Sequence, residues 1–150
     1  MSISRQNLSV IIVSYISGEV IHNCIKSIPK DIQIIVVDNS GDHKFKFDIE
    51  KRYDNIKCIL SPENLGMGAG NNLGLKHTNT DYVLILNPDV ILENNTIDEL
   101  IDASNKIDSF GIIAPIINSD KNMNFKLFDK NKINVDNSKP FLVKSVDGFA

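Results

Sequence analysis

The chain has 150 residues, of which 42% are hydrophobic and 23% are charged, and its formal net charge is −3. This length fits one ordinary domain that holds its core without a disulfide or a metal, and this composition excludes a disordered chain, a collagen and a disulfide-rich scaffold. A charge near zero gives no electrostatic reason to expect a nucleic-acid partner.

Two cysteines, Cys24 and Cys58, lie in apolar stretches, and no cysteine or histidine pair has metal-ligand spacing. We expect two buried free thiols in a reducing compartment. The N-terminal residues are polar, and the apolar run over 10–13 is too short for a signal peptide or a membrane span. We therefore expect a cytoplasmic location.

Strand-like and helix-like segments alternate along the chain. Continuous runs rich in β-branched residues predict buried strands over 8–15, 32–37, 56–60 and 82–86, and a shorter last strand over 141–146. No helix is predicted between the second and third of these strands.

Apolar residues at helical spacing predict a first helix over 20–28, with Ser17 as its N-cap. A second helix begins in the latter part of a glycine-rich segment and ends near His77. A third follows Thr96-x-x-Glu99, which has the spacing of a capping box. The alternation favours an α/β domain with a mainly parallel sheet, and such sheets bind ligands at the carboxyl ends of their strands.

The residues that end the predicted strands are therefore the candidates for function. Asp38 follows the second strand, where an acid either forms the turn or accepts hydrogen bonds from a base or ribose. The segment 66–74 holds four glycines, but its spacing fits neither the Rossmann nor the Walker pattern. Its glycines permit close approach of a ligand, and the start of a helix favours an anion.

Asn87-Pro88-Asp89 directly follows the fourth strand. The proline ends the strand and fixes the turn, which holds Asp89 at the edge of the sheet. Mg²⁺ and Mn²⁺ take one or two protein carboxylates and complete their coordination with phosphate oxygens and water. Asp89 is thus a candidate metal ligand, although the tripeptide is also an ordinary turn.

Together, these segments resemble the family 2 glycosyltransferases, and most closely the rhamnosyltransferase-like subgroup. The motifs that carry the resemblance occur in the family's order, and they are VIIVSY, IIVVDNS, NLGMGAGNNLG and YVLILNPDV. The resemblance runs from about residue 8 to 150. It implies the GT-A fold, an α/β sandwich, and the inverting transfer of a sugar from a nucleotide diphosphate donor to an acceptor hydroxyl.

The resemblance also implies roles for the first two strand ends. Ser14 and Tyr15 match the strand end that lies against the base of the donor. Asp38 matches the acid that binds the base or its ribose, and Asn39 beside it belongs to the same nucleotide-sugar site.

The later motifs match the part of the family's site that holds the sugar diphosphate. Gly66, Gly68 and Asn71 match the stretch that lines the donor. Asn87 and Asp89 match the ends of the D-x-D signature, in which the last acid holds Mg²⁺ or Mn²⁺ on the diphosphate. Asparagine in the first position is a departure that leaves one fewer charge for the metal.

The last residues, 146–150, resemble a V-D-G-F segment that precedes the acceptor half in this family, and Gly148 is placed with the donor site on that ground. No downstream E-D motif, which supplies the catalytic base in the family, is present. We therefore expect 1–150 to be a single donor-binding domain, incomplete at its C-terminus and inactive alone.

The resemblance implies a donor of the dTDP-rhamnose or UDP-sugar type, and a saccharide or lipid-linked acceptor in bacterial surface polysaccharide synthesis. It further implies work at the inner face of the membrane, with peripheral association through segments outside this chain. Two alternatives remain: a non-catalytic nucleotide-sugar-binding domain, and a receiver-like signalling domain with flavodoxin-type topology. The latter normally has an acidic pair where this chain has Ser14-Tyr15.

Overall fold

The structure is a computed structural model of the whole chain, and it describes residues 2–116, 124–128 and 140–146. The chain divides into two compact units, Ile3–Asn94 and Asn95–Phe149. Each unit is described by itself below.

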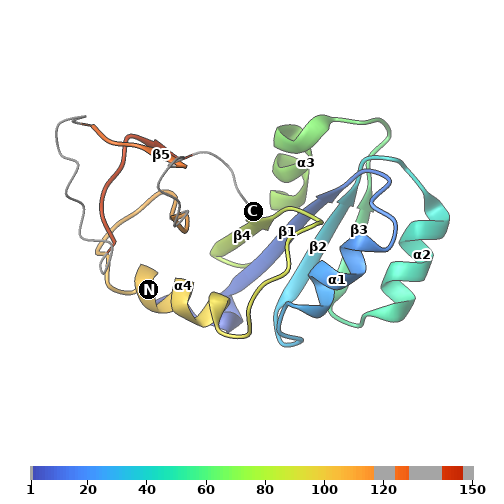
Figure 1. Cartoon of the computed structure of the whole chain (residues 1–150). Coiled ribbons are helices and arrows are strands. Elements are labelled where there is room, and N and C mark those ends of the chain that lie inside the picture. Colours follow the sequence, from blue (N-terminus) through green and yellow to red (C-terminus); the bar gives the residue numbers. More distant parts are fainter. Residues whose placement is uncertain (1, 117–123, 129–139, 147–150) are drawn as a thin grey trace. The chain divides into compact units, whose positions relative to one another are not determined.

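The first unit is built on a four-stranded parallel sheet (Figure 1). Its strands are β1 (Leu8–Ser14), β2 (Gln33–Asp38), β3 (Ile56–Leu60) and β4 (Tyr82–Leu86), in the order β3-β2-β1-β4. β1 and β2 are the central strands, and their apolar residues are almost completely buried. The predicted α/β fold with a mainly parallel sheet is confirmed.

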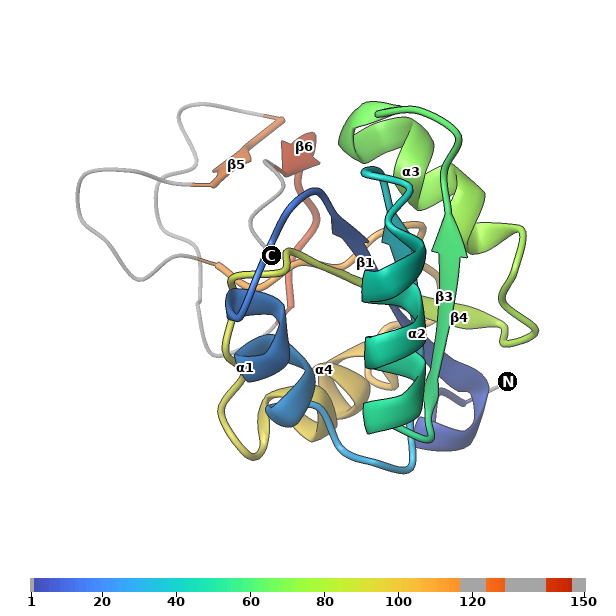
Figure 2. The same cartoon turned by 90° about the vertical axis from the view of Figure 1, so that its right-hand side faces the viewer.

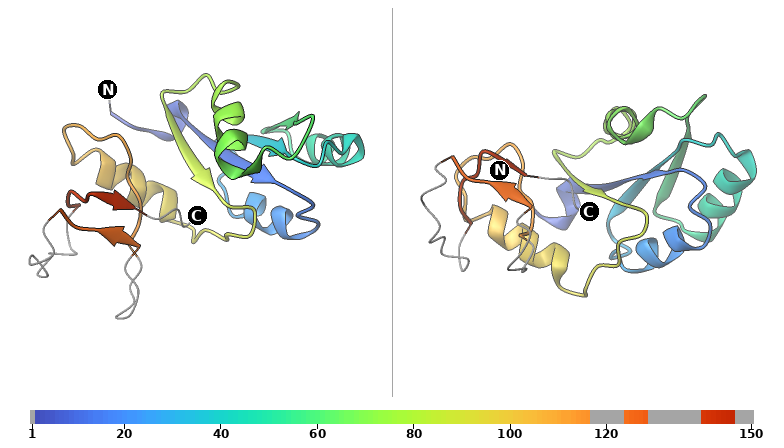
Figure 3. Two further views of the ribbon diagram at one scale, coloured as in Figure 1. Left: turned by 90° about the horizontal axis from the view of Figure 1, so that it is seen from above. Right: turned by 45° about the horizontal axis from the view of Figure 1, so that its top comes forward.

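Helices cover both faces of this sheet. α1 (Val20–Lys26) and α2 (His43–Arg52) lie on one face, and α3 (Gly66–Leu75) lies on the other (Figure 3). A core cluster of Ile11, Ile35 and Val37 lies under α3, because alternate residues of a strand point to the same face. This arrangement explains the uninterrupted apolar runs of β1 and β2.

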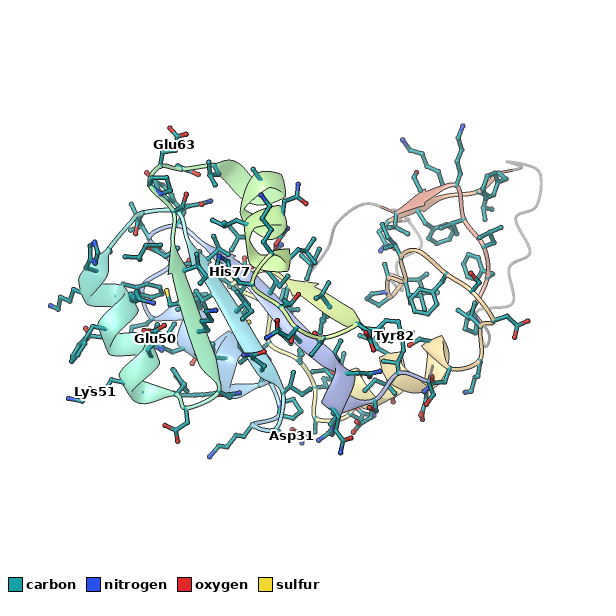
Figure 4. All side chains as sticks on the ribbon, turned by 180° about the vertical axis from the view of Figure 1, so that it is seen from behind. Asp31, Glu50, Lys51, Glu63, His77 and Tyr82 are labelled. Atoms are coloured by element: carbon teal, nitrogen blue, oxygen red, sulfur yellow. The ribbon has the colours of Figure 1, made fainter. Side chains whose placement is uncertain are left out.

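The helix α2 was not predicted from the sequence. It runs beside β3 (Figure 2), and its N-cap is Asp42, whose carboxylate accepts hydrogen bonds from the backbone N–H groups of Lys44 and Phe45. Figure 4 shows Lys51 pointing away from the sheet, whereas Glu50 accepts hydrogen bonds from Lys46 and from the backbone of β3. Few residues of α2 are buried against the sheet, so the apolar pattern that would reveal a helix in the sequence is weak.

Two predicted helix caps are wrong. The N-cap of α1 is Glu19, and the Ser17 side chain instead accepts a hydrogen bond from Ser14 Oγ at 2.9 Å. Thr96 lies inside α4, whose N-cap is Asn95, so the predicted capping box with Glu99 does not form. The Asn95 side chain donates to Glu99 Oε1 at 2.5 Å instead.

The second unit contains α4 (Thr96–Ser104) and a two-stranded antiparallel sheet of β5 (Phe125–Lys126) and β6 (Ser145–Val146). The predicted last strand is therefore much shorter than 141–146.

A short 3₁₀ helix, η1 (Arg5–Asn7), precedes β1 in the first unit. Within the described residues, no helix has the length and apolar character that crossing a bilayer requires.

Candidate active site at the carboxyl ends of the strands

The carboxyl ends of β1, β2 and β3 lie level with one another, because Ser14 pairs with Asp38 and Asp38 pairs with Leu60. The chain runs from β1 to β2 to β3 and then returns to the other side of β1 for β4. The sheet therefore has a topological switch point between β1 and β4, which is where open α/β sheets bind their ligands.

A pocket with a volume of about 470 Å³ lies at this switch point, entirely within the first unit. Five residues of the predicted site line it: Tyr15, Asn39, Gly66, Asn87 and Asp89. Its other lining residues are Val13, Ser17, Val20, Asn64, Met67 and Pro88. Its size lies within the range of small-molecule sites, and it is mainly apolar with a few polar groups, as such sites usually are.

The two residues at the end of β1 that were predicted to lie against a base differ in their exposure. Ser14 is buried, and its hydroxyl donates to Ser17 Oγ at 2.9 Å. Tyr15 lies beside it in the pocket and is 53% exposed. The next residue, Ile16, has a φ of 52°, a backbone conformation that β-branched residues rarely adopt. Of these two predicted residues, Tyr15 is the one whose side chain a ligand in the pocket can contact.

Asp38 is 1% exposed and does not line the pocket. Its carboxylate accepts two hydrogen bonds from Ser40 Oγ, at 2.9 and 2.7 Å, and one from the backbone N–H of Asp42 at 2.9 Å. These contacts organise the turn between β2 and α2, which is the turn-forming role that the sequence left open. A direct contact of Asp38 with a base or ribose stays a prediction.

Asn39, which follows β2, is hydrogen-bonded to the end of β1 and to the start of α3. Its backbone N–H donates to Ser14 O at 2.8 Å, and its Nδ2 donates to Gly66 O at 3.3 Å. The residue is 3% exposed, and its Oδ1 is buried with no hydrogen-bond partner in the described part of the chain. A buried amide oxygen without a partner costs free energy, so this atom is a candidate acceptor for a ligand N–H or O–H group.

The glycine-rich segment enters its helix earlier than predicted. α3 begins at Gly66, whose φ of 71° favours glycine, and Asn64 Oδ1 accepts a hydrogen bond from the Gly66 N–H at 3.0 Å. Gly66 and Met67 line the pocket, so the first turn of α3 opens onto it, and helix starts favour an anion.

Gly68 and Asn71 lie inside this helix and do not line the pocket. The Asn71 side-chain oxygen is buried and has no partner among the described residues. The glycines at 70 and 74 serve packing, because a Cβ at Gly70 would lie 2.8 Å from Val13 Cγ1. Only the start of the predicted glycine loop therefore belongs to the pocket.

Asn87, Pro88 and Asp89 bring the end of β4 to the same pocket. Asp89 is exposed, whereas Cys24 of α1 is buried behind the turn. Burial, and then the nearby charge of Asp89, raises the pKa of the Cys24 thiol to about 11. This thiol is therefore protonated at neutral pH, and its Sγ donates to Asn87 O at 3.5 Å.

The residues of this turn fit a hard divalent cation only in part. Within the described residues, no three histidine, cysteine or acidic side chains cluster as a metal site. Asp89 supplies one carboxylate and Asn87 an amide oxygen, which are the donor types that Mg²⁺ and Mn²⁺ accept. The fit is that of a site completed by phosphate oxygens and water rather than by the protein alone.

The profile of the family described as "Glycosyl transferase family 2" matches residues 9–144. The chain belongs to glycosyltransferase family 2. It is 35% identical over 115 residues to the low-salt glycan biosynthesis hexosyltransferase Agl10 of Haloferax volcanii, and the match covers 74% of this chain and 36% of that protein.

A second relative is the N-acetylglucosaminyl-diphospho-decaprenol L-rhamnosyltransferase of Mycobacterium tuberculosis, which is 24% identical over 73% of this chain and 41% of that protein. The crystal structure of S. aureus TarS 1-349 in complex with UDP has the same fold, with a TM-score of 0.57 and 21% identity over 75% of this chain and 40% of that one. The chain thus spans well under half the length of these relatives.

The strand order of this family 2 domain excludes one alternative. A flavodoxin-type receiver places β1 between β2 and β3, whereas here β2 lies between β1 and β3. The receiver-like interpretation is therefore wrong.

Sequence reasoning missed several residues of the pocket. Asn64 and Met67 flank the start of α3, and the N-x-G spacing of an Asx turn would have pointed to Asn64. No sequence signal distinguishes Val20 from the apolar residues that α1 buries, although it is exposed at the pocket. The predicted site residue Gly148 lies outside the described residues.

Proposed function

We propose that this chain is the donor-binding part of an inverting glycosyltransferase. The observation that carries the proposal is that Tyr15, Asn39 and Asp89, from three different strand ends, line one pocket at the switch point of the sheet. Membership of glycosyltransferase family 2 supports a nucleotide-sugar as the ligand, and a structural neighbour is described in complex with UDP.

In this proposal the base of the donor lies against Tyr15 and accepts or donates hydrogen bonds near the end of β2. Asn39 Oδ1, which is buried and has no partner among the described residues, suits an N–H or O–H group of the nucleoside. The diphosphate lies at the first turn of α3, where backbone N–H groups and the helix dipole favour negative charge. Each part of a nucleotide diphosphate thereby meets groups of matching chemistry.

Asp89, with Asn87 beside it, would hold Mg²⁺ or Mn²⁺ against the diphosphate. When bound, such a cation supplies positive charge that stabilises the leaving nucleotide diphosphate. Because Asp89 is the single carboxylate among the described residues that line the pocket, we expect the cation to bind tightly only together with the nucleotide. A general base that deprotonates the acceptor hydroxyl is also required. We assign none within 1–150, and we propose that this chain alone binds the donor without transferring the sugar.

The names of the relatives suggest the transferred group and the acceptor. The relatives include a rhamnosyltransferase and a hexosyltransferase by name, so we propose dTDP-rhamnose or a UDP-sugar as donor. The first of these names contains a lipid-linked acceptor, and for this chain we propose a lipid-linked or saccharide acceptor in bacterial surface polysaccharide synthesis at the inner face of the membrane. A third relative, from Staphylococcus epidermidis, is named a teichoic acid poly(glycerol phosphate) polymerase, so the shared region alone does not fix the transferred group.

Calorimetric titration with UDP and with dTDP, each with and without Mn²⁺, tests the proposal. We expect binding of one of the two that strengthens with Mn²⁺, and Asp89→Asn should remove the strengthening without lowering the metal-free affinity, because a carboxylate alone does not attract a diphosphate. Asp81→Asn, an exposed acid before β4 and outside the pocket, is the matched control. Absence of binding by the folded protein would refute the donor-binding role, whereas sugar transfer by these 150 residues would refute the proposed inactivity.

A further inference from the structure

The hydroxyl of Ser27 links the C-terminal end of α1 to the segment that carries Asp89. Ser27, the C-cap of α1, donates its hydroxyl to Cys24 O at 2.6 Å. The same Oγ accepts a hydrogen bond from the backbone N–H of Leu92 at 3.0 Å. The hydroxyl therefore ties the far end of the segment Asn87–Leu92 to α1.

The near end of this segment is tied to the same helix. Cys24 is completely buried, and its Sγ donates to Asn87 O at 3.5 Å. Residues three apart on a helix share a face, so Cys24 and Ser27 present one surface of α1 to the segment. Between the two ties, the Val90 N–H donates to Asn87 O at 3.3 Å and closes a turn around Asp89.

The position of Asp89 depends on the turn that carries it. Its side chain is exposed and lies in the turn after the edge strand β4. A ligand group on a loop is precise only when supporting contacts restrict the loop. The hydrogen bonds of Cys24 and Ser27 with the segment restrict it in this way.

We propose that Cys24 and Ser27 are positioning residues that hold the segment Asn87–Leu92, and so keep Asp89 in the donor pocket. The inference rests on the proposed function for its effect on metal and nucleotide, but the restraint on the segment is independent of any ligand. Ser27 carries the larger part, because a hydroxyl is a stronger hydrogen-bonding group than a thiol.

Two measurements on the full chain test the inference, with Ser27→Ala as the main variant. Hydrogen exchange reports on the Leu92 amide, which loses its acceptor in Ser27→Ala, and calorimetry gives the UDP or dTDP affinity with and without Mn²⁺. Ser27→Thr keeps the hydroxyl and should restore both properties. Thr78→Ala is the matched control, since the Thr78 hydroxyl bonds Leu75 O at the end of α3, away from the segment.

We expect Ser27→Ala to speed exchange at Leu92 by about tenfold or more, and to weaken the Mn²⁺-dependent affinity by about threefold to tenfold, as the loss of one hydrogen bond predicts. The metal-free affinity should stay within about twofold of the unsubstituted protein. Cys24→Ala should show a smaller change of the same kind, and it replaces Ser27→Ala if that variant does not fold.

Unchanged exchange at Leu92 in both variants would overturn the inference, and so would faster exchange with an unchanged Mn²⁺-dependent affinity. Equal loss of metal-free and Mn²⁺-dependent affinity would also overturn it, because that is the result of a general structural defect. If the unsubstituted protein binds no nucleotide, the proposed function fails, while the exchange result still decides whether α1 restrains the segment.

Discussion

Gly74 of α3 lies directly against Ile11 at the centre of β1. A Cβ built at position 74 would lie 2.7 Å from Ile11 Cγ2 and 3.3 Å from Val37 Cγ2. Gly70, one helical turn earlier, has the same relation to Val13. The two glycines let α3 approach the sheet closely, and so place the start of the helix at the pocket.

Substitution of Gly74 by alanine should therefore lower the free energy of unfolding by about 1–3 kcal/mol, the usual range for overpacking a core. Chemical denaturation measures the change. Gly68→Ala is the control, since a Cβ there meets nothing within 4 Å. It should be neutral or stabilising, because alanine favours a helix by about 0.5–1 kcal/mol over glycine. Equal effects of the two substitutions would contradict the packing role.

The backbone of Ile16 predicts a substitution that stabilises the protein. Its φ is 52° and its side chain is 75% exposed, so the left-handed conformation is strained while the side chain contributes little packing. Ile16→Asn should raise the free energy of unfolding by about 1 kcal/mol, because asparagine tolerates this conformation. Ile16→Val, which keeps the β-branched side chain, should give no gain. A stabilisation by valine as large as that by asparagine would exclude relief of backbone strain as the cause.

The two thiols should be unreactive in the folded protein. Cys24 and Cys58 are completely buried, and burial raises their pKa values to about 11 and about 12. A thiol reagent such as DTNB at about pH 8 requires the thiolate, so it should label neither residue until denaturant is added, and then both. Rapid labelling of one thiol in the native state would show that its surroundings open.

His22 should make stability depend on pH. Its Nδ1 lies 3.1 Å from the Tyr53 hydroxyl, and burial, followed by the charge of Arg52, lowers its pKa below 6.5. Once the pH falls to the pKa that His22 has in the unfolded chain, the unfolded chain binds more protons than the folded one. The free energy of unfolding therefore decreases as the pH falls. Unfolding free energies at about pH 7.5 and about pH 5.5 should differ less for His22→Phe than for the unsubstituted protein. A difference that His22→Phe leaves unchanged would contradict this.

The strands were predicted well because their signal is local. Runs such as that of Leu8–Ser14 are apolar without interruption, and burial on both faces of a parallel sheet produces that pattern directly. The residues Asn87 and Asp89 were found for the same reason, since a clear strand end precedes them. The sequence thus predicted the sheet and the side of it on which the pocket lies.

What the sequence could not predict depends on contacts between distant segments. α2 buries only Ile49 completely, so its helical pattern is faint, and its Asp42 cap is recognised only once the helix is known. Asp38 and Asn39 are neighbours with similar chemistry, and only the fold shows that the first is used in a turn while the second lines the pocket. The early start of α3 depends on the φ of Gly66, which the sequence allows but does not require.

The most direct test of the central claim is an NMR titration of the ¹⁵N-labelled chain with UDP or dTDP, followed by Mn²⁺. The nucleotide should shift the amide signals of Tyr15, Asn39 and Met67, and Mn²⁺ should then broaden those of Asn87 and Asp89 because it is paramagnetic. No shift at the pocket residues with either nucleotide, or broadening by Mn²⁺ that is centred elsewhere in the chain, would contradict the account.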